Sequence, residues 1–250
     1  MKPILRIRNL KKNYQDLDGE VEALGGIDID VYEGELLSIV GPSGCGKTSL
    51  LSVLSNLEEK SNGNIEFEND NIKIGYMLQK DALFPWRTIL ENCLIGLEIQ
   101  NNLTEETKNK VIELLNTYGL GDFMNKYPSS LSGGMRQRVA LIRTLAIDPD
   151  ILFLDEPFSA LDYLTRIYLS EDVYQIIKKE GKTAILVTHD LAEAVSLSDR
   201  VAVLSKRPAI VKKVYNIDIP NKSTPIENRK KKEFHEYYDQ IWRDLDAHIS

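Results

Sequence analysis

The sequence predicts an α/β fold in which a largely parallel sheet follows an N-terminal antiparallel β region and is interrupted by an inserted helical subdomain. Three observations support this class. Apolar runs typical of buried strands (LLSIV, ILFLDEP and TAILVTHD) are separated by helical segments. The glycine-rich segment GPSGCGKT directly follows the first run. Between residues 88 and 147 the apolar period becomes helical, which interrupts the alternation.

The first 40 residues have the pattern of strands and turns. Apolar residues alternate with polar ones or form continuous runs in LRIRNLKKNY and IDIDVYEGELLSIV. The turn pair Glu33-Gly34 separates two of these runs. We expect a helix from Lys47 through Leu57, because leucines recur there at helical spacing. A turn over residues 61–64 and two short strands, IEFE and KIGYML, complete this part of the chain.

The inserted helical subdomain is expected over residues 88–147. Thr104 can cap one of its helices, and Gly119 can end that helix. Another helix is predicted from about Ser132 to Ala146, before Pro149. This helical stretch interrupts the alternation of strands and helices, so it is predicted to be an inserted subdomain.

The rest of the chain returns to strands and ends in a helix. Two buried-strand runs flank a helix, and RVAVL with AIVKKVYNID is predicted to form a hairpin. The chain is therefore predicted to be one domain, with a core over residues 1–87 and 148–215 and a helical tail over residues 216–250. A helical stripe in that tail is expected to pack against the domain rather than bind a partner: Phe234, Tyr237, Ile241, Leu245, and His248 or Ile249.

The composition argues against several classes of protein. Hydrophobic residues make up 42% and charged residues 28%, as in ordinary globular domains. The net charge of −7 argues against a nucleic-acid partner, which would require many cationic contacts. No run approaches the roughly 20 apolar residues of a membrane span, and no export signal is evident. With only Cys45 and Cys93, no disulfide framework is indicated, and we expect a cytosolic protein.

The glycine-rich segment carries the most specific chemistry. GPSGCGKT fits the pattern GxxxxGK[ST] between a buried strand and a helix, which is the context of a phosphate-binding P-loop. Glycines let backbone amides converge on phosphate oxygens, the lysine adds positive charge, and the threonine hydroxyl can bind Mg²⁺. The predicted nucleotide site comprises Gly41, Pro42, Ser43, Gly44, Cys45, Gly46, Lys47, Thr48 and Ser49.

Two acidic residues end the strand ILFLDE. Asp155 lies where the strand emerges and can hold Mg²⁺, whereas Glu156 points elsewhere and can orient or deprotonate an attacking water. His189 ends the next apolar run, and Gln79 ends KIGYMLQ. Spacing alone leaves these last two side chains open between a structural and a functional role.

The order of these motifs resembles that of the ATP-binding cassette (ABC) ATPases. GPSGCGKT, Gln79, LSGGM (131–135), ILFLDEP, SALD (159–162) and His189 occur in the family's order, and the match spans residues 4 to about 215. Its LSGG signature is highly specific, because P-loop kinases and GTPases lack it. The resemblance implies a P-loop NTPase core that hydrolyses ATP with Mg²⁺.

The resemblance also implies roles for single residues. Tyr14 would stack on adenine, Gln79 would sense Mg²⁺ and the transporter partner, and Glu156 would be the general base. His189 would hold the γ-phosphate, and Asp162 would communicate across a dimer.

Two further sets of residues take roles from the same resemblance. The metal ligands would be Thr48, Gln79 and Asp155. A signature loop would close over ATP bound to a second copy of the chain, so that two chains enclose two ATP molecules. That loop comprises Leu131, Ser132, Gly133, Gly134 and Met135.

One position departs from the family pattern. The family usually has Gln where this chain has Met135, which cannot donate a hydrogen bond, so the amides of the two signature glycines remain as donors. The forms LSGGMRQR and LFPWRTILEN (83–92) resemble the nitrate, sulfonate and taurine branch of ABC importers.

Membership of that branch implies a set of partners. We expect a homodimer, peripheral at the cytoplasmic face of the cell membrane, with two permease subunits and, through them, an external solute-binding protein. The segment Phe84-Pro85-Trp86-Arg87 is the candidate permease contact, although Trp86 could equally be core.

Two other functions are weighed against this interpretation. The first is a soluble ABC ATPase acting on nucleic acid or ribosomes, against which stand the single cassette, the lack of sustained heptads and the net charge of −7. The second is a P-loop small-molecule kinase, which would leave LSGGM and SALD unexplained. The transported solute is not encoded in this chain, and an exporter role stays open, because the direction of transport is inferred only from the branch resemblance.

Overall fold

One mixed sheet of nine strands organises the computed structural model, which describes residues 2–16, 19–159 and 161–246. Ala160 of SALD, and His248 and Ile249 of the predicted tail stripe, lie outside the described residues. The strand order is β4-β1-β2-β9-β8-β3-β7-β6-β5. The strands are β1 (Pro3–Asp16), β2 (Gly19–Tyr32), β3 (Leu36–Val40), β4 (Asn62–Phe67), β5 (Ile74–Met77), β6 (Ile151–Asp155), β7 (Thr183–Val187), β8 (Arg200–Leu204) and β9 (Ala209–Asn216).

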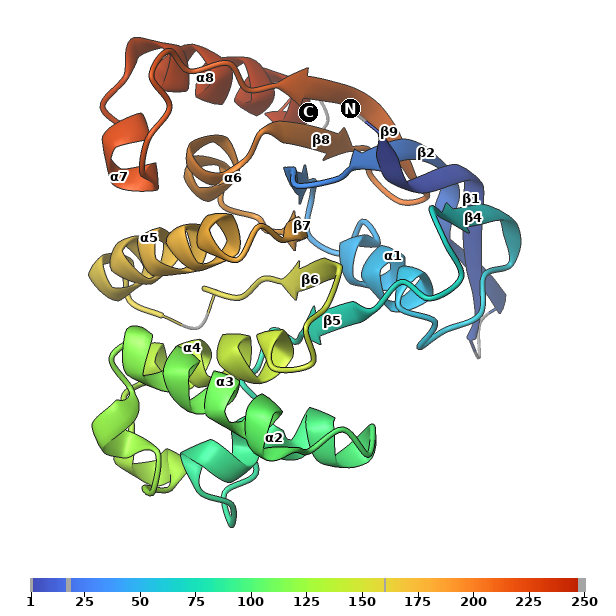
Figure 1. Ribbon diagram of the computed structural model, residues 1–250. Coiled ribbons are helices and arrows are strands. Elements are labelled where there is room, and N and C mark those ends of the chain that lie inside the picture. Colours follow the sequence, from blue (N-terminus) through green and yellow to red (C-terminus); the bar gives the residue numbers. More distant parts are fainter. Residues whose placement is uncertain (1, 17–18, 160, 247–250) are drawn as a thin grey trace.

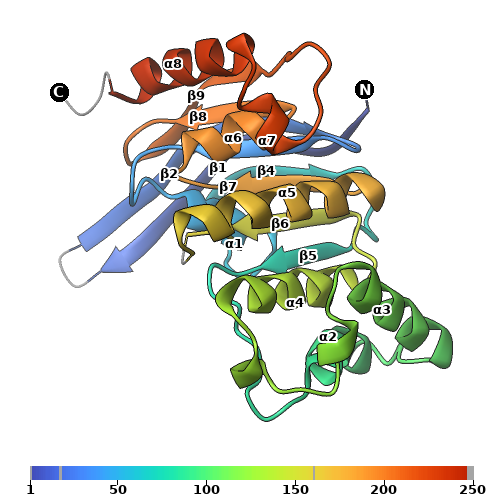
Figure 2. The same ribbon diagram turned by 90° about the vertical axis from the view of Figure 1, so that its left-hand side faces the viewer.

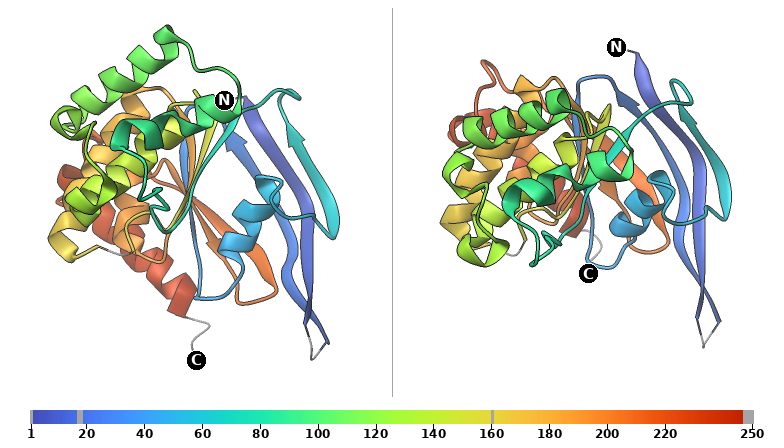
Figure 3. Two further views of the ribbon diagram at one scale, coloured as in Figure 1. Left: turned by 90° about the horizontal axis from the view of Figure 1, so that it is seen from below. Right: turned by 60° about the horizontal axis from the view of Figure 1, so that its bottom comes forward.

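Helices cover the sheet and build a separate lobe (Figures 1 and 2). The helices are α1 (Lys47–Leu54), α2 (Ile89–Ile99), α3 (Glu105–Thr117), α4 (Gly133–Leu145), α5 (Tyr163–Lys179), α6 (Leu191–Leu197), α7 (Pro225–Asn228) and α8 (Lys232–Asp246). Figure 3 shows α1 between the parallel strands and the antiparallel strands β1, β2 and β4, with the other helices on the far side of the parallel strands.

The parallel block β8-β3-β7-β6-β5 determines where the functional side chains meet. All neighbouring strands in this block are parallel, and Asp155 at the end of β6 is in register with Val187 at the end of β7. Their carboxyl ends therefore lie along one edge of the sheet, where ligands bind in open α/β sheets. The predicted fold class is confirmed, including the antiparallel pairing of β1 with β2 and the β8–β9 hairpin.

Two apolar clusters pack against the two faces of the parallel strands. Leu50, Leu51 and Leu54 of α1 pack with β1, β2 and the parallel strands on one face. On the other face, apolar residues of α4 and α5 pack against the same strands. Central strands are buried on both sides, which is why β3, β6 and β7 read as continuous apolar runs in the sequence.

The inserted segment forms its own apolar cluster from α2, α3 and α4. As predicted, Thr104 caps α3, and its hydroxyl accepts a hydrogen bond from the Thr107 amide. The buried Asn92 of α2 forms two hydrogen bonds with the loop that precedes α2. The Phe84 amide donates to Asn92 Oδ1 at 2.7 Å, and Asn92 Nδ2 donates to the Phe84 carbonyl at 3.1 Å. This clamp orders the segment that connects β5 to the helical lobe.

Two predicted boundaries are wrong for identifiable reasons. The helix from Lys47 ends at Leu54, because Asn56 takes a positive φ of 57° and the Leu57 amide bonds back to Ser52; Leu57 is left exposed. The turn expected at residues 61–64 is instead the start of β4, paired with β1. Gly63 permits this pairing, since a Cβ there would lie 2.2 Å from the Asn9 carbonyl oxygen.

The C-terminal helix α8 packs on the domain as predicted. Phe234 and Ile241 are buried against α6 and β8, and Tyr237 and Leu245 are partly buried in the same cluster. The tail is not helical throughout, because a loop separates β9 from the short helix α7. Within the described ranges, no helix has the length and apolar character needed to cross a membrane.

Candidate active site

The glycine loop, predicted to bind phosphate, lies between β3 and α1. Gly44 and Gly46 have φ angles of 72° and 119°, in the region that favours glycine. A Cβ on Gly46 would also lie 2.9 Å from the Ala23 carbonyl oxygen. Lys47 is folded over the loop, where its Nζ donates to the carbonyls of Gly41 at 2.9 Å and Pro42 at 3.1 Å.

A threonine and an aspartate meet at the start of α1. The Thr48 hydroxyl donates to Asp155 Oδ1 at 3.2 Å, and the Tyr76 hydroxyl donates to Asp155 Oδ2 at 3.2 Å. Asp155 is buried, and this burial raises its pKa above the ordinary value while the Thr48 and Tyr76 hydrogen bonds oppose the rise. Tyr76 was missed by sequence reasoning, because nothing in its spacing marks it.

Glu156, the residue after Asp155, contacts a histidine and a glutamine. Glu156 Oε2 lies 3.2 Å from His189 Nδ1 and accepts a hydrogen bond from Gln79 Nε2 at 3.3 Å. These residues follow β6, β7 and β5, which are neighbours in the sheet. Glu156 has a positive φ of 45°, a strained conformation that turns the chain directly after Asp155. The two acidic side chains therefore contact different groups: Asp155 contacts Thr48 and Tyr76, and Glu156 contacts His189 and Gln79.

Gln79 is held in the site through its side-chain nitrogen. Its amide donates to Glu156 and to Ser159 Oγ at 3.2 Å. In the part of the chain that the structure describes, no hydrogen bond joins it to Thr48 or Asp155. Ser159, the first residue of SALD, also donates to the Glu156 carbonyl at 3.0 Å. Its place in SALD was the only signal that could have drawn attention to this serine.

Tyr14, the predicted adenine contact, lies beside the P-loop helix α1. Its hydroxyl lies 3.0 Å from Ser49 Oγ and donates to Glu58 Oε2 at 2.5 Å. Lys12 Nζ is positioned over the ring, 4.7 Å from its centroid. Burial and the Glu58 carboxylate raise the pKa of the Tyr14 hydroxyl.

The signature loop begins α4, away from the P-loop of its own chain. Ser132 caps this helix, with its Oγ accepting from the Met135 amide at 3.3 Å. The side chain of Met135 packs into the apolar cluster of the helical lobe, so it needs no polar partner. Among the described residues, no hydrogen bond or ion pair joins residues 131–135 to residues 41–49.

Leu161 of SALD packs against the signature loop. A Cβ on Gly133 would be 3.2 Å from Leu161 Cδ2, so the glycine allows close packing with this leucine. Asp162 caps α5 by accepting from the Thr165 amide at 3.1 Å, and these hydrogen bonds lower its pKa. Asp162 is otherwise exposed, so its position leaves its carboxylate accessible to another chain.

Comparison with known proteins identifies the family. The ABC transporter family profile matches residues 24–159. The chain is 43% identical over 249 residues to the uncharacterized ABC transporter ATP-binding protein YtlC of Bacillus subtilis strain 168, covering 97% of this chain and 96% of the relative. This chain belongs to the ABC transporter family.

Two other comparisons indicate the branch of the family to which this ABC protein belongs and support its fold. It is 39% identical over 235 residues to the taurine import ATP-binding protein TauB of Jannaschia sp. strain CCS1, covering 91% of this chain and 87% of the relative. The dimeric post-hydrolysis structure of the ATP-binding cassette MJ0796, bound to ADP and Pi, matches with a TM-score of 0.74 and 30% identity, covering 86% of this chain and 99% of that one. The ABC chain is thus an ATPase of the importer branch, and a small-molecule kinase is excluded.

Proposed function

We propose that this chain is the ATP-hydrolysing subunit of a membrane importer for a small solute, and that two copies enclose two ATP molecules. The position of Glu156 carries the proposal. Its carboxylate lies 3.2 Å from His189 Nδ1 and 3.3 Å from Gln79 Nε2, at the same sheet edge as the P-loop. The γ-phosphate of bound ATP would lie at this edge.

Glu156 is suited to act as the general base. Both of its contacts use Oε2, and within the described part of the chain no hydrogen bond engages Oε1. Oε1 is therefore available to accept a proton from a water molecule that attacks the γ-phosphate. His189 and Gln79 hold the carboxylate in place, and His189, which is half exposed, can also turn toward the phosphate.

The pair Thr48 and Asp155 fits Mg²⁺. A hydroxyl and a carboxylate oxygen lie 3.2 Å apart, and both are hard oxygen donors of the kind that Mg²⁺ prefers. A Mg²⁺ ion held by these two oxygens would neutralise charge that develops on the phosphates. Gln79 would contribute its Oε1 to this set, because its hydrogen bonds to Glu156 and Ser159 use only Nε2.

The second copy would supply the signature loop to each site. Residues 131–135 and the P-loop make no polar contact within the described chain, whereas both sets of residues are arranged as anion-binding helix starts. A twofold-symmetric dimer uses both surfaces at once, with Asp162 beside the signature loop. Adenine would stack on the face of Tyr14 that is opposite Lys12.

The segment after Gln79 is the proposed contact with the permease. Trp86 is 71% exposed, so it is not a core residue, and its ring rests on Phe84 at a centroid distance of 5.3 Å. An exposed tryptophan on a loop clamped by Asn92 is suited to bind a partner. We place the subunit at the cytoplasmic face of the membrane, bound to two permease subunits and, through them, to an external solute-binding protein.

The solute class is proposed from the relatives. The similarity to a protein named for taurine import supports a small solute such as taurine, another sulfonate, nitrate or a related compound. Specificity would reside in the permease and the external binding protein.

Replacing Glu156 by Gln tests the proposed chemistry. The substitution keeps the shape of the side chain but removes the proton acceptor, so ATP turnover should fall by about 100-fold or more while ATP binding and ATP-dependent dimerisation persist. Phosphate release and size-exclusion chromatography with ATP measure these properties. Glu113→Gln, at an exposed position on α3, is the matched control. Turnover of Glu156→Gln near that of the control would refute the general-base assignment.

A further inference from the structure

Arg166, in the first turns of α5, bonds to two loops of the site. Its Nη2 donates to the Leu161 carbonyl at 3.1 Å, within SALD. Its Nη1 donates to Asp190 Oδ2 at 3.4 Å, directly after His189. One guanidinium therefore joins the segment before α5 to the segment before α6, which are far apart in the sequence.

A buried glutamate extends this connection. Arg166 Nε lies 3.8 Å from Glu193 Oε1 and makes no hydrogen bond of its own, although it is buried. Glu193 Oε2 accepts from the Thr188 hydroxyl at 2.7 Å, and the Asp190 amide donates to Thr188 Oγ1 at 3.0 Å. Arg166 thus contacts a network that includes the residues on both sides of His189.

His189 connects this network to Glu156, the proposed general base. Its Nδ1 lies 3.2 Å from Glu156 Oε2, whereas no hydrogen bond or ion pair joins Arg166 to Glu156 within the described chain. At the other end, Leu161 packs against the signature residue Gly133. A displacement of SALD would therefore move Arg166 and, through Asp190, the backbone that carries His189.

We propose that Arg166 is a positioning residue of the ATPase site, which keeps His189 against Glu156 by tying Leu161 to Asp190. The inference rests on the proposed function, in which Glu156 is the general base. Arginine suits the task because its planar guanidinium presents several donors in a fixed arrangement, whereas the single ammonium of lysine cannot span both loops. The contact with SALD makes the position of His189 depend on the segment nearest the proposed partner copy.

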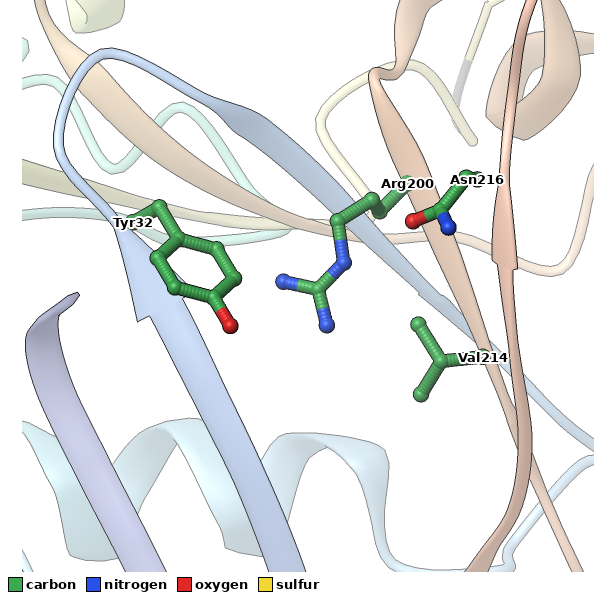
Figure 4. A pocket seen from close by; sticks show the side chains of 4 residues that line it. All are labelled: Tyr32, Arg200, Val214 and Asn216. Atoms are coloured by element: carbon green, nitrogen blue, oxygen red, sulfur yellow. The ribbon is translucent and has the colours of Figure 1, made fainter. Parts of the chain in front are cut away.

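The same side chains could serve stability alone, and a second arginine of the chain separates the two explanations. Arg200 donates to the Asp30 carbonyl at 2.9 Å and to the buried Glu35 at 3.0 Å. It also lies over the Tyr32 ring, 4.9 Å from the centroid (Figure 4). Arg200 thus has the same kinds of contact as Arg166, but within the described residues no hydrogen bond or ion pair joins it to SALD or to the His189 segment.

Arg166→Met and Arg200→Met, made in the full chain, form the matched comparison. We expect Arg166→Met to lower the single-turnover rate of ATP hydrolysis by about 10- to 100-fold, because small misplacements of catalytic groups are costly, while the Kd for ATP changes by less than about threefold. Arg200→Met should leave the rate within about twofold, even where the two variants lose similar thermal stability. Arg166→Lys, which retains the charge, should show the same rate loss and serves if the Met variant does not fold.

A double-mutant cycle tests whether Arg166 acts through His189. In the His189→Ala background, Arg166→Met should cause no further loss of rate, because the group that it positions is gone. An unchanged rate in Arg166→Met and Arg166→Lys, an equal loss in Arg200→Met, or full additivity with His189→Ala would each overturn the inference. Glu156→Gln in the same assay separates the two proposals. Near-normal turnover of that variant overturns the proposed function as well, whereas its inactivity beside a normal Arg166→Met overturns this inference alone.

Discussion

Glu193→Gln should remove a pH-dependent contribution to the stability of this protein. Glu193 on α6 is only 3% exposed, and burial raises its pKa from 4.5 to about 7. Asp190 adds to the rise, whereas the Thr188 hydrogen bond and the charges of Arg166 and Arg229 oppose it. The folded protein therefore holds a proton on this carboxyl at pH values where the unfolded chain has released it.

The sign and size of the effect follow from this difference. Between pH 4.5 and about 7 the folded state binds more protons than the unfolded state, so the free energy of unfolding decreases as the pH rises. The stabilisation is fully present below pH 4.5 and is lost as the pH passes through about 7. At about 1.4 kcal/mol for each pH unit, the total change amounts to about 3 kcal/mol.

Glutamine has a similar shape and no proton to lose, so the variant lacks this change. The unfolding free energy of Glu193→Gln relative to wild type should rise by about 2.5 kcal/mol between pH 5 and pH 8 and then level off. Urea titrations of the nucleotide-free protein at several pH values measure the difference. Glu113→Gln, at an exposed site, controls for loss of a charge. A difference between Glu193→Gln and wild type that stays constant across this range would refute the reasoning.

Two further predictions concern the partners. Trp86→Ala should weaken recovery of the subunit with its permease but leave ATP binding by the isolated chain unchanged, because the side chain is exposed and outside the P-loop; unchanged pull-down of the membrane subunits would contradict this role. The second experiment uses Glu156→Gln chains that also carry either Lys47→Ala or Ser132→Arg. Each of these double variants should fail to trap ATP when tested alone. Their mixture should trap ATP, because one site of a mixed dimer combines an intact P-loop with an intact signature loop. Filter-bound labelled ATP measures trapping, and no gain on mixing, once heterodimers are shown to form, would argue that the loops do not pair between chains.

Elements whose signal is local could be predicted from the sequence. The P-loop connects one strand to the next helix, so its pattern of glycines, lysine and threonine specifies the turn without reference to distant residues. The ends of α1 and β4 were mispredicted because each depends on a contact that the local pattern does not contain. Asn56 adopts a positive φ after α1, and Gly63 closely approaches Asn9 of β1. The exposure of Trp86, which the sequence left open, was decided by the loop that Asn92 holds.

The sequence by itself determined that this protein has an α/β core with a P-loop, acids after a buried strand and a glycine signature on a separate helical segment. Only the tertiary structure decided which of these groups touch. Gln79, Glu156 and His189 meet because β5, β6 and β7 are adjacent, and Arg166 reaches Asp190 because α5 and α6 lie side by side. Contacts of about 3 Å between distant residues depend on strand order and helix packing. No local periodicity contains that information.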